Sequence, residues 1–197
     1  MYTASLEDIK KLRETSLASI VYCKQALEEA GGDFNEALKI LEQKGLAKAA
    51  SKSERTVGAG VIDSYIHYNK QLGVLLDIRC ETDFVARNEE FQKLAHELCL
   101  QIAAMNPLWV SRANIPAEVM EERRLMYVKE ASAEGKKPEE IIGKIVNGKL
   151  ESFFSETCLL DQAYIKENDK KVNDLVAGAI AKLGENIKVN SFARLSL

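Results

Sequence analysis

The residue types that most often carry out covalent or metal chemistry are scarce in this sequence. It contains two histidines and four cysteines in 197 residues. The cysteines lie far apart, without the spacing of a metal site, at Cys23, Cys80, Cys99 and Cys158. One catalytic arrangement can be drawn, with Cys80 as a nucleophile near Asp83 and His67. No neighbour in the sequence makes the surroundings of Cys80 electropositive, so an enzyme is the least supported class of protein.

Phosphate-binding loops are also missing from the sequence. The G-x-x-x-x-G-K-[ST] pattern of a P-loop does not occur. Gly58-Ala59-Gly60 is a fragment of a glycine motif without its third glycine, and a flexible linker is the favoured interpretation. We therefore expect no nucleotide bound through a P-loop, no metal site, no catalytic residue and no cofactor.

Composition and charge narrow the choice of partners. Hydrophobic residues make up 46% of the chain, which is enough for a folded core. The net charge of −3, with no basic block, argues against nucleic-acid binding driven by phosphate neutralisation. No apolar run approaches the roughly 18 residues of a membrane-spanning helix, and the first residues lack the features of a secretory signal. We expect a cytoplasmic protein that binds another protein or a small molecule, with no membrane or direct nucleic-acid partner.

Residues 1–54 predict a compact module of three short helices followed by a linker. Ser5 with Asp8, and Asp33 with Glu36, form patterns typical of a helix N-terminus. The third helix is expected to end at Gly45, with a helical or extended linker after it. Apolar residues at helical spacing should form the small core of this module; they are Leu6, Ile9, Leu12, Ile20, Cys23, Leu27, Ala30, Phe34, Ala37, Leu38 and Leu41.

Residues 55–197 predict an α+β core and dimerisation domain. The β-branched and alternating patterns of Val61–Tyr68 and Leu72–Cys80 indicate an antiparallel hairpin. Residues 116–154 indicate a helical hairpin that protrudes from the core. Two further helices are expected, at about Asn88–Met105 and Lys171–Leu183. A terminal strand follows, in which apolar residues alternate onto one face at Ile187, Val189, Ala193 and Leu195.

The segment between the strand hairpin and the next helix runs from Cys80 to Asn88. On its residues alone, Thr82 or Asp83 is interpreted as a helix cap, and Phe84 as an aromatic residue of the core. Caps and core aromatic residues are both common at junctions of this kind.

Four strings of the sequence, in order, resemble the elongation factor Ts family. CETDFVARNEEF (residues 80–91) is similar to the family's signature. Residues 12–50 resemble its ubiquitin-associated-type module, YIHYNKQLGVLL (65–76) its core hairpin, and EGKKPEEIIGKIVNGKLESFF (134–154) its helical protrusion. The fold implied is a three-helix ubiquitin-associated-like module, followed by an antiparallel-sheet core with packed helices and the protruding hairpin.

Two departures from the family pattern are visible. The family has Thr-Gly-Ala-Gly, two methionines and Asp at the turn into its second helix, where this chain has Thr15–Tyr22. The apolar pair is kept as Ile20-Val21, but the glycines are replaced. Longer members carry a second related copy of the core, whereas this sequence has one copy and resembles the short form.

The resemblance implies a guanine nucleotide exchange factor without covalent chemistry, which binds elongation factor Tu with GDP. In the family, residues matching Asp83 and Phe84 enter the nucleotide-binding domain of Tu beside its Mg²⁺ site. Phe84 would wedge packed side chains apart, and Asp83 would disturb the groups that hold the water shell of the metal. Thr82 and Val85 would fix the loop that presents them.

Further partner contacts implied by the resemblance come from Ile20, Val21, Lys24 and His67. For Ile20 a core position, and for Lys24 and His67 an ordinary surface position, remain as alternatives. A rival function is a general adaptor, in which the three-helix module binds another protein and the core dimerises. Because only one core copy is present, we expect a homodimer that pairs without a disulfide.

Overall fold

The computed structural model describes residues 2–16, 18, 20–133 and 138–197. The chain divides into two compact units. The first unit comprises Met1–Val61, Ile78–Leu94 and Asp174–Lys188, and the second comprises Ile62–Asp77, Ala95–Asn173 and Val189–Leu197. The separation into modules at residue 54 stays a prediction.

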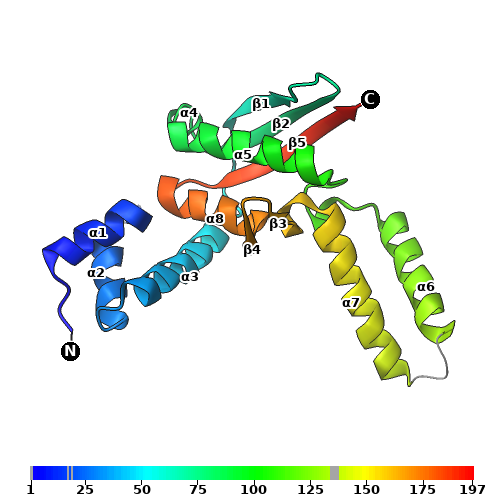
Figure 1. Cartoon of the computed structure of the whole chain (residues 1–197), viewed down its shortest axis with the longest axis horizontal. Coiled ribbons are helices and arrows are strands. Elements are labelled where there is room, and N and C mark those ends of the chain that lie inside the picture. The colour runs from blue at the N-terminus through cyan, green and yellow to red at the C-terminus, as the bar shows by residue number, and fades with distance from the viewer. Residues whose placement is uncertain (1, 17, 19, 134–137) are drawn as a thin grey trace. The chain divides into compact units, whose positions relative to one another are not determined.

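The chain has an α+β fold, with three helices before the first strand and most of the later helices between β2 and β3, which confirms the predicted class (Figure 1). In order, the elements are α1 (Leu6–Ser16), α2 (Ile20–Glu29), α3 (Phe34–Lys52), β1 (Ala59–Ile66), β2 (Leu72–Cys80), α4 (Asp83–Ala86), α5 (Glu89–Met105), the 3₁₀ turn η1 (Arg112–Asn114), α6 (Ala117–Ala133), α7 (Glu139–Thr157), the 3₁₀ turn η2 (Leu159–Asp161), β3 (Ala163–Tyr164), β4 (Glu167–Lys171), α8 (Val172–Leu183) and β5 (Ile187–Ser196).

The first and third N-terminal helices begin where the sequence predicts. The Asp8 amide donates to Ser5 Oγ at 3.1 Å, and the Glu36 amide donates to Asp33 Oδ1 at 2.8 Å. These side chains satisfy amide groups that the first turn of a helix leaves unpaired. Six side chains form the buried core of the module; they are Ile9, Leu12, Cys23, Ala26, Leu27 and Ala37.

Two details of the module differ from the sequence prediction. Helix α3 continues through Gly45 to Lys52, so the linker is mostly helical. Gly45 lies directly against Ala181 of α8, where an added Cβ would come within 3.3 Å of the alanine methyl group. The glycine therefore allows a close helix approach and does not end the helix. Leu6 is exposed, because a residue six positions before Leu12 lies about 120° away from it around the helix.

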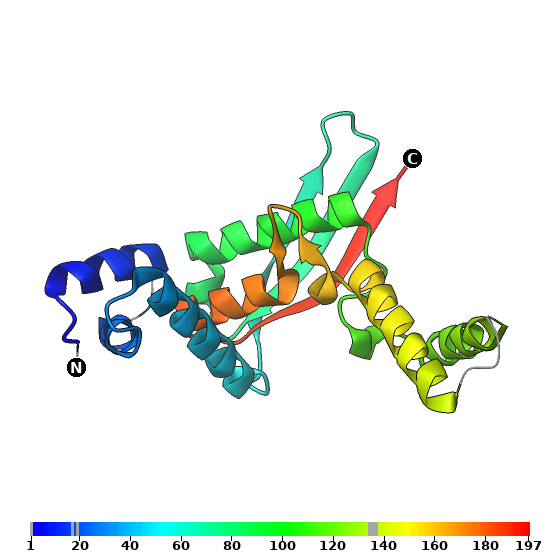
Figure 2. The same ribbon diagram turned by 60° about the horizontal axis from the view of Figure 1, so that its bottom comes forward.

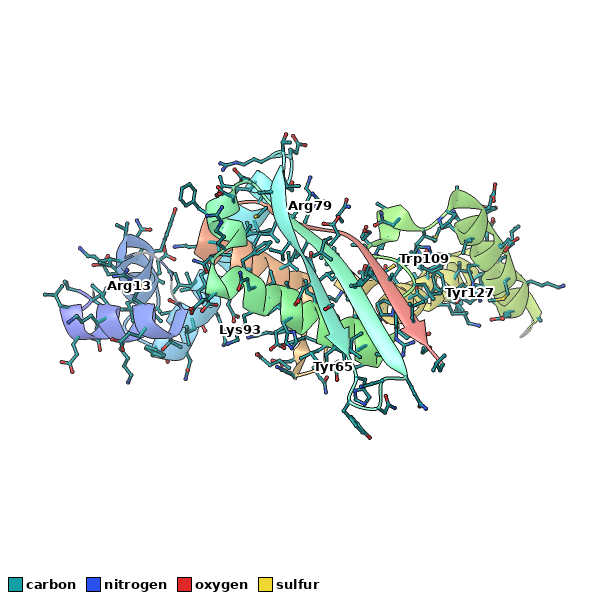
Figure 3. All side chains as sticks on the ribbon, turned by 90° about the horizontal axis from the view of Figure 1, so that it is seen from above. Arg13, Tyr65, Arg79, Lys93, Trp109 and Tyr127 are labelled. Atoms are coloured by element: carbon teal, nitrogen blue, oxygen red, sulfur yellow. The ribbon has the colours of Figure 1, made fainter. Side chains whose placement is uncertain are left out.

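Strands β1, β2 and β5 form a three-stranded sheet in the order β1-β2-β5. The predicted hairpin is present, and its alternation buries Val74, Leu76 and Ile78 on one face of β2. Figure 3 shows the strands in front of α5, with no helix drawn over their near face. Within the second unit, this uncovered face carries exposed apolar side chains: Ile62, Ile66, Leu75 and Leu195.

The terminal strand departs from the predicted alternation in its second half. Ile187 is buried and Val189 is half-buried, as expected, but Asn190 and Ser191 are both exposed. The two faces exchange at this point, so Phe192 and Arg194 are half-buried while Ala193 and Leu195 are exposed. A slip of one residue moves every later side chain to the opposite face.

The predicted helical hairpin consists of α6 and α7, which lie side by side in Figures 1 and 2. Residues 135–137 of the predicted break lie outside the described residues. The base of the hairpin has a core of its own, built from Ile115, Phe153, Phe154 and Cys158. Among the helices of the described residues, none combines the length and apolarity needed to cross a membrane.

Candidate functional site

The segment after β2 forms a single helical turn, α4, that is capped by Thr82. The Thr82 backbone is extended (φ −127°, ψ 159°), and its side-chain oxygen accepts from the Val85 amide at 3.5 Å. The Ala86 and Arg87 amides close the turn by donating to the carbonyls of Thr82 and Asp83, at 3.2 and 3.1 Å. The predicted cap at Thr82 is therefore present.

Phe84 is the most prominent side chain of this turn. It is 82% exposed, so its interpretation as a core aromatic residue is wrong. On the same turn Ala86 is buried and Val85 is half-buried, and these residues face the protein. A large apolar ring held in water by a capped turn is available to a partner.

Asp83 lies beside Phe84 and is also open to solvent. Its carboxylate pairs with the Arg87 guanidinium at 3.0 Å, and the two side chains are 59% and 80% exposed. Exposed pairs four residues apart on a helix contribute little stability, so a partner can displace Arg87 from Asp83 easily. Together, Asp83 and Phe84 offer one charged and one apolar contact on neighbouring positions.

The thiol of Cys80 is poorly suited to be a nucleophile. It is buried, and its Sγ donates to the Thr82 carbonyl at 3.1 Å. Burial, and after it the charge of Glu185, raises the pKa of the Cys80 thiol. A raised pKa lowers the fraction of reactive thiolate at neutral pH, which argues against the catalytic arrangement.

The alternative of a metal site in the chain itself finds no support. Among the described residues, no group of three or more histidine, cysteine, aspartate or glutamate side chains could hold a metal ion.

In the second unit, His67 belongs to an aromatic cluster at the tip of the strand hairpin. The Tyr65 hydroxyl and His67 Nδ1 are 2.7 Å apart, and the ring centroids of His67 and Tyr68 are 4.5 Å apart. Figure 3 marks Tyr65 near the end of β1. His67 is half-buried and Tyr68 is exposed. The tip therefore presents an aromatic surface, of which only His67 was singled out in the sequence.

In the first unit, the start of α2 presents an exposed apolar patch. Ile20 is 53% exposed and Val21 is 62% exposed, so the interpretation of Ile20 as a core residue is wrong. Tyr22 continues the patch and was missed in the sequence, although an aromatic residue next to an exposed apolar pair was a usable signal. Lys24 lies one turn further on, where its ammonium is 3.8 Å from Glu28. In the altered stretch before α2, Leu17 and Ser19 lie outside the described residues.

Comparison with known proteins decides the family. A family model for elongation factor TS matches residues 1–197, the whole chain. The chain belongs to the elongation factor Ts family. Elongation factor Ts of Thermodesulfovibrio yellowstonii is 52% identical over 189 residues, which cover 96% of this chain and 94% of that protein. Those of Thermotoga maritima and Thermosipho melanesiensis are 50% and 47% identical, and the alignments cover at least 96% of each chain.

Membership of the elongation factor Ts family gives the chain a role in translation elongation. The alignments cover 94–96% of the length of these relatives. Of the residues at which the sequence resemblance predicts partner contacts, Ile20, Val21, Asp83 and Phe84 are exposed and His67 is half-buried.

Proposed function

We propose that this member of the elongation factor Ts family is a guanine nucleotide exchange factor that releases GDP from elongation factor Tu in the cytoplasm. The observation that carries the proposal is the exposed Phe84 ring on a capped turn of the first unit. A buried Phe84 would have had no means of reaching a partner.

The proposed mechanism is an exchange of binding energies. A factor that binds nucleotide-free Tu more tightly than Tu with GDP must weaken GDP binding by the same ratio. Its effect is limited by that difference in affinity. No bond is made or broken in this mechanism, so it needs no nucleophile and no cofactor on this chain.

The residues have separate roles in this mechanism. Phe84 inserts between packed side chains of the nucleotide-binding domain of Tu, and such packing rearranges in discrete steps because interiors are close-packed. Asp83 competes for groups that hold the water shell of the bound Mg²⁺, which tolerates only near-octahedral geometry. Thr82 and Val85 hold the turn that carries both side chains.

A second set of residues provides affinity. The patch of Ile20 and Val21, with Lys24 on the next turn, docks on Tu through apolar burial and one positive charge. His67 provides a further contact from the hairpin tip. Docking and insertion use different surfaces, so they should affect different kinetic parameters. Docking should determine the half-saturating concentration of the chain, and insertion should determine the maximal rate constant of GDP release.

We also propose that two copies pair through the core. The uncovered sheet face carries Ile62, Ile66, Leu75 and Leu195, and the order β1-β2-β5 leaves β1 and β5 as edge strands. Apolar faces and strand edges of this kind favour association. All four cysteines are buried, so the pairing would not depend on a disulfide.

Stopped-flow fluorescence with a fluorescent GDP analogue on Tu tests the function directly. Catalytic amounts of this chain should accelerate release in the presence of excess unlabelled GDP. Decay that is unchanged at micromolar concentrations of the chain would contradict the exchange function and leave the adaptor alternative.

A further inference from the structure

The turn that carries Phe84 is fastened to a distant part of the sequence. One carboxylate oxygen of Glu185, Oε2, accepts from the Thr82 amide at 2.9 Å, and the other, Oε1, accepts from the Thr82 hydroxyl at 2.6 Å. Glu185 belongs to the connection between α8 and β5, in the same compact unit as the turn. Both hydrogen bonds involve a charged acceptor, which makes them stronger than bonds between neutral groups.

These two bonds determine how Thr82 caps the turn. A threonine hydroxyl has one hydrogen to donate and two lone pairs to accept with. Because the hydrogen of Thr82 is directed to Glu185, the lone pairs are left for the Val85 amide, which donates to the same oxygen. Glu185 thereby fixes both the backbone and the side-chain rotamer of the cap residue.

The connection that carries Glu185 is itself anchored. The Asn186 amide donates to Glu81 Oε1 at 2.7 Å, so residues 81–82 and 185–186 are joined by consecutive contacts. The buried side chain of Asn186 donates to the carbonyls of Ser53 and Arg55, at 3.2 and 2.8 Å. The Lys52 ammonium also donates to the Gly184 carbonyl. The connection that carries Glu185 is therefore anchored by several hydrogen bonds.

We propose that Glu185 is a positioning residue for nucleotide exchange, because it clamps Thr82 and so holds the Asp83-Phe84 turn in the conformation that inserts into the partner. This inference rests on the proposed function. Ordering a flexible turn during binding costs conformational entropy and weakens the affinity. A turn that is already ordered in the free protein avoids this cost. The Phe84 ring can then keep its position during insertion, so that the side chains of the partner have to move.

The test compares Glu185→Ala and Glu185→Gln with a matched control. The control, Glu167→Ala, likewise removes one carboxylate from the chain, but from β4, far from the turn in sequence; the Glu167 carboxylate is 2.8 Å from the Lys170 ammonium. GDP release is measured over a range of chain concentrations, to give a maximal rate constant and a half-saturating concentration. Amide hydrogen exchange at residues 82–86 of the free, intact variants gives a second measurement that needs no partner.

We expect Glu185→Ala to lower the maximal rate constant about tenfold, with the half-saturating concentration within about twofold of the unsubstituted chain, because insertion and not docking is impaired. Glu185→Gln keeps one acceptor oxygen and should retain an intermediate rate. Amides 82–86 should exchange faster in the alanine variant. Glu167→Ala should match the unsubstituted chain in every measurement.

Three results would overturn the inference, and they are distinguishable. If the unsubstituted chain itself leaves GDP release unchanged, the proposed function is wrong and the inference falls with it. If that chain is active and Glu185→Ala keeps its maximal rate constant, Glu185 does not position the turn. If the alanine variant only reaches the same maximal rate at a higher concentration, the substitution has reduced the folded fraction, and the role of Glu185 is structural alone.

Discussion

Phe84→Ala is the substitution that separates a partner-binding ring from a structural one. The ring is 82% exposed, so its removal takes away little of the contact that stabilises the fold. Substitutions at such surface positions change the free energy of unfolding by about 0.5 kcal/mol or less, which is a shift of about 2 °C or less in Tm for a chain of this size. Removal of a buried phenylalanine would instead cost about 3–5 kcal/mol, or about 6–20 °C.

The effect of Phe84→Ala on exchange should be much larger. Full burial of a phenylalanine ring in the complex contributes about 1.5–3 kcal/mol. If this energy is gained mainly as the nucleotide leaves, its loss slows GDP release by about 10- to 150-fold. The measurement is the maximal rate constant of release of a fluorescent GDP analogue from Tu, together with thermal unfolding followed by circular dichroism.

Phe91→Ala provides the matched control, since Phe91 lies in the same unit and is 0% exposed. That variant should lose stability by the amount expected for a core phenylalanine. A fall in Tm of similar size for Phe84→Ala would refute the argument from exposure. A normal Tm with an unchanged maximal rate constant would show that the ring does not act on the nucleotide.

The other surfaces lead to three further predictions. Val21→Asp should raise the half-saturating concentration at least tenfold without lowering the maximal rate constant. Leu125 on α6 is similarly exposed, and the control Leu125→Asp should change neither quantity. Equal effects of the two variants would contradict docking by α2. All four cysteines are buried, and burial raises the pKa of Cys99 to about 12. Thiol reagents at about pH 8 should therefore react slowly with the chain and leave exchange intact. Rapid labelling with loss of exchange would support a catalytic cysteine. Light scattering under reducing conditions should give twice the chain mass of 21.9 kDa, and Leu75→Lys should favour the monomer. A mass near that of one chain across micromolar concentrations would exclude the dimer, and dissociation only on adding reductant would exclude non-covalent pairing.

Features set by neighbouring residues were predictable from the sequence. The helix starts at Ser5 and Asp33 follow from side chains that bond to amides three residues away. The strand hairpin follows from alternation within β2, which packs one face and leaves the other open. In both cases the pattern and its physical cause lie within a few residues of each other.

Features set by tertiary contacts were not predictable in this way. Gly45 predicts a helix end, but α3 continues through it, and Gly45 packs against Ala181 in the folded unit. The exposure of Phe84 could not be obtained from periodicity, because α4 has only four residues and a turn of that length has no repeating face. The contact of Thr82 with Glu185 joins positions 103 residues apart.

The proposed exchange function would require both the exposure of Phe84 and the hydrogen bonds that hold this turn. A partner interior that is close-packed resists insertion, and the resistance acts equally on the inserted ring. On a loosely held turn, Phe84 would move aside and would contact Tu without displacing its packed side chains. Tu with GDP and Tu without GDP would then be bound with similar affinity. Equal affinity for the two states shifts nothing, however tight the binding. In the proposed mechanism, the cap at Thr82 and the hydrogen bonds from Glu185 would therefore supply the stiffness that converts contact by Phe84 into a difference in affinity. The weak Asp83–Arg87 pair leaves the neighbouring charge free to change partners during the same step.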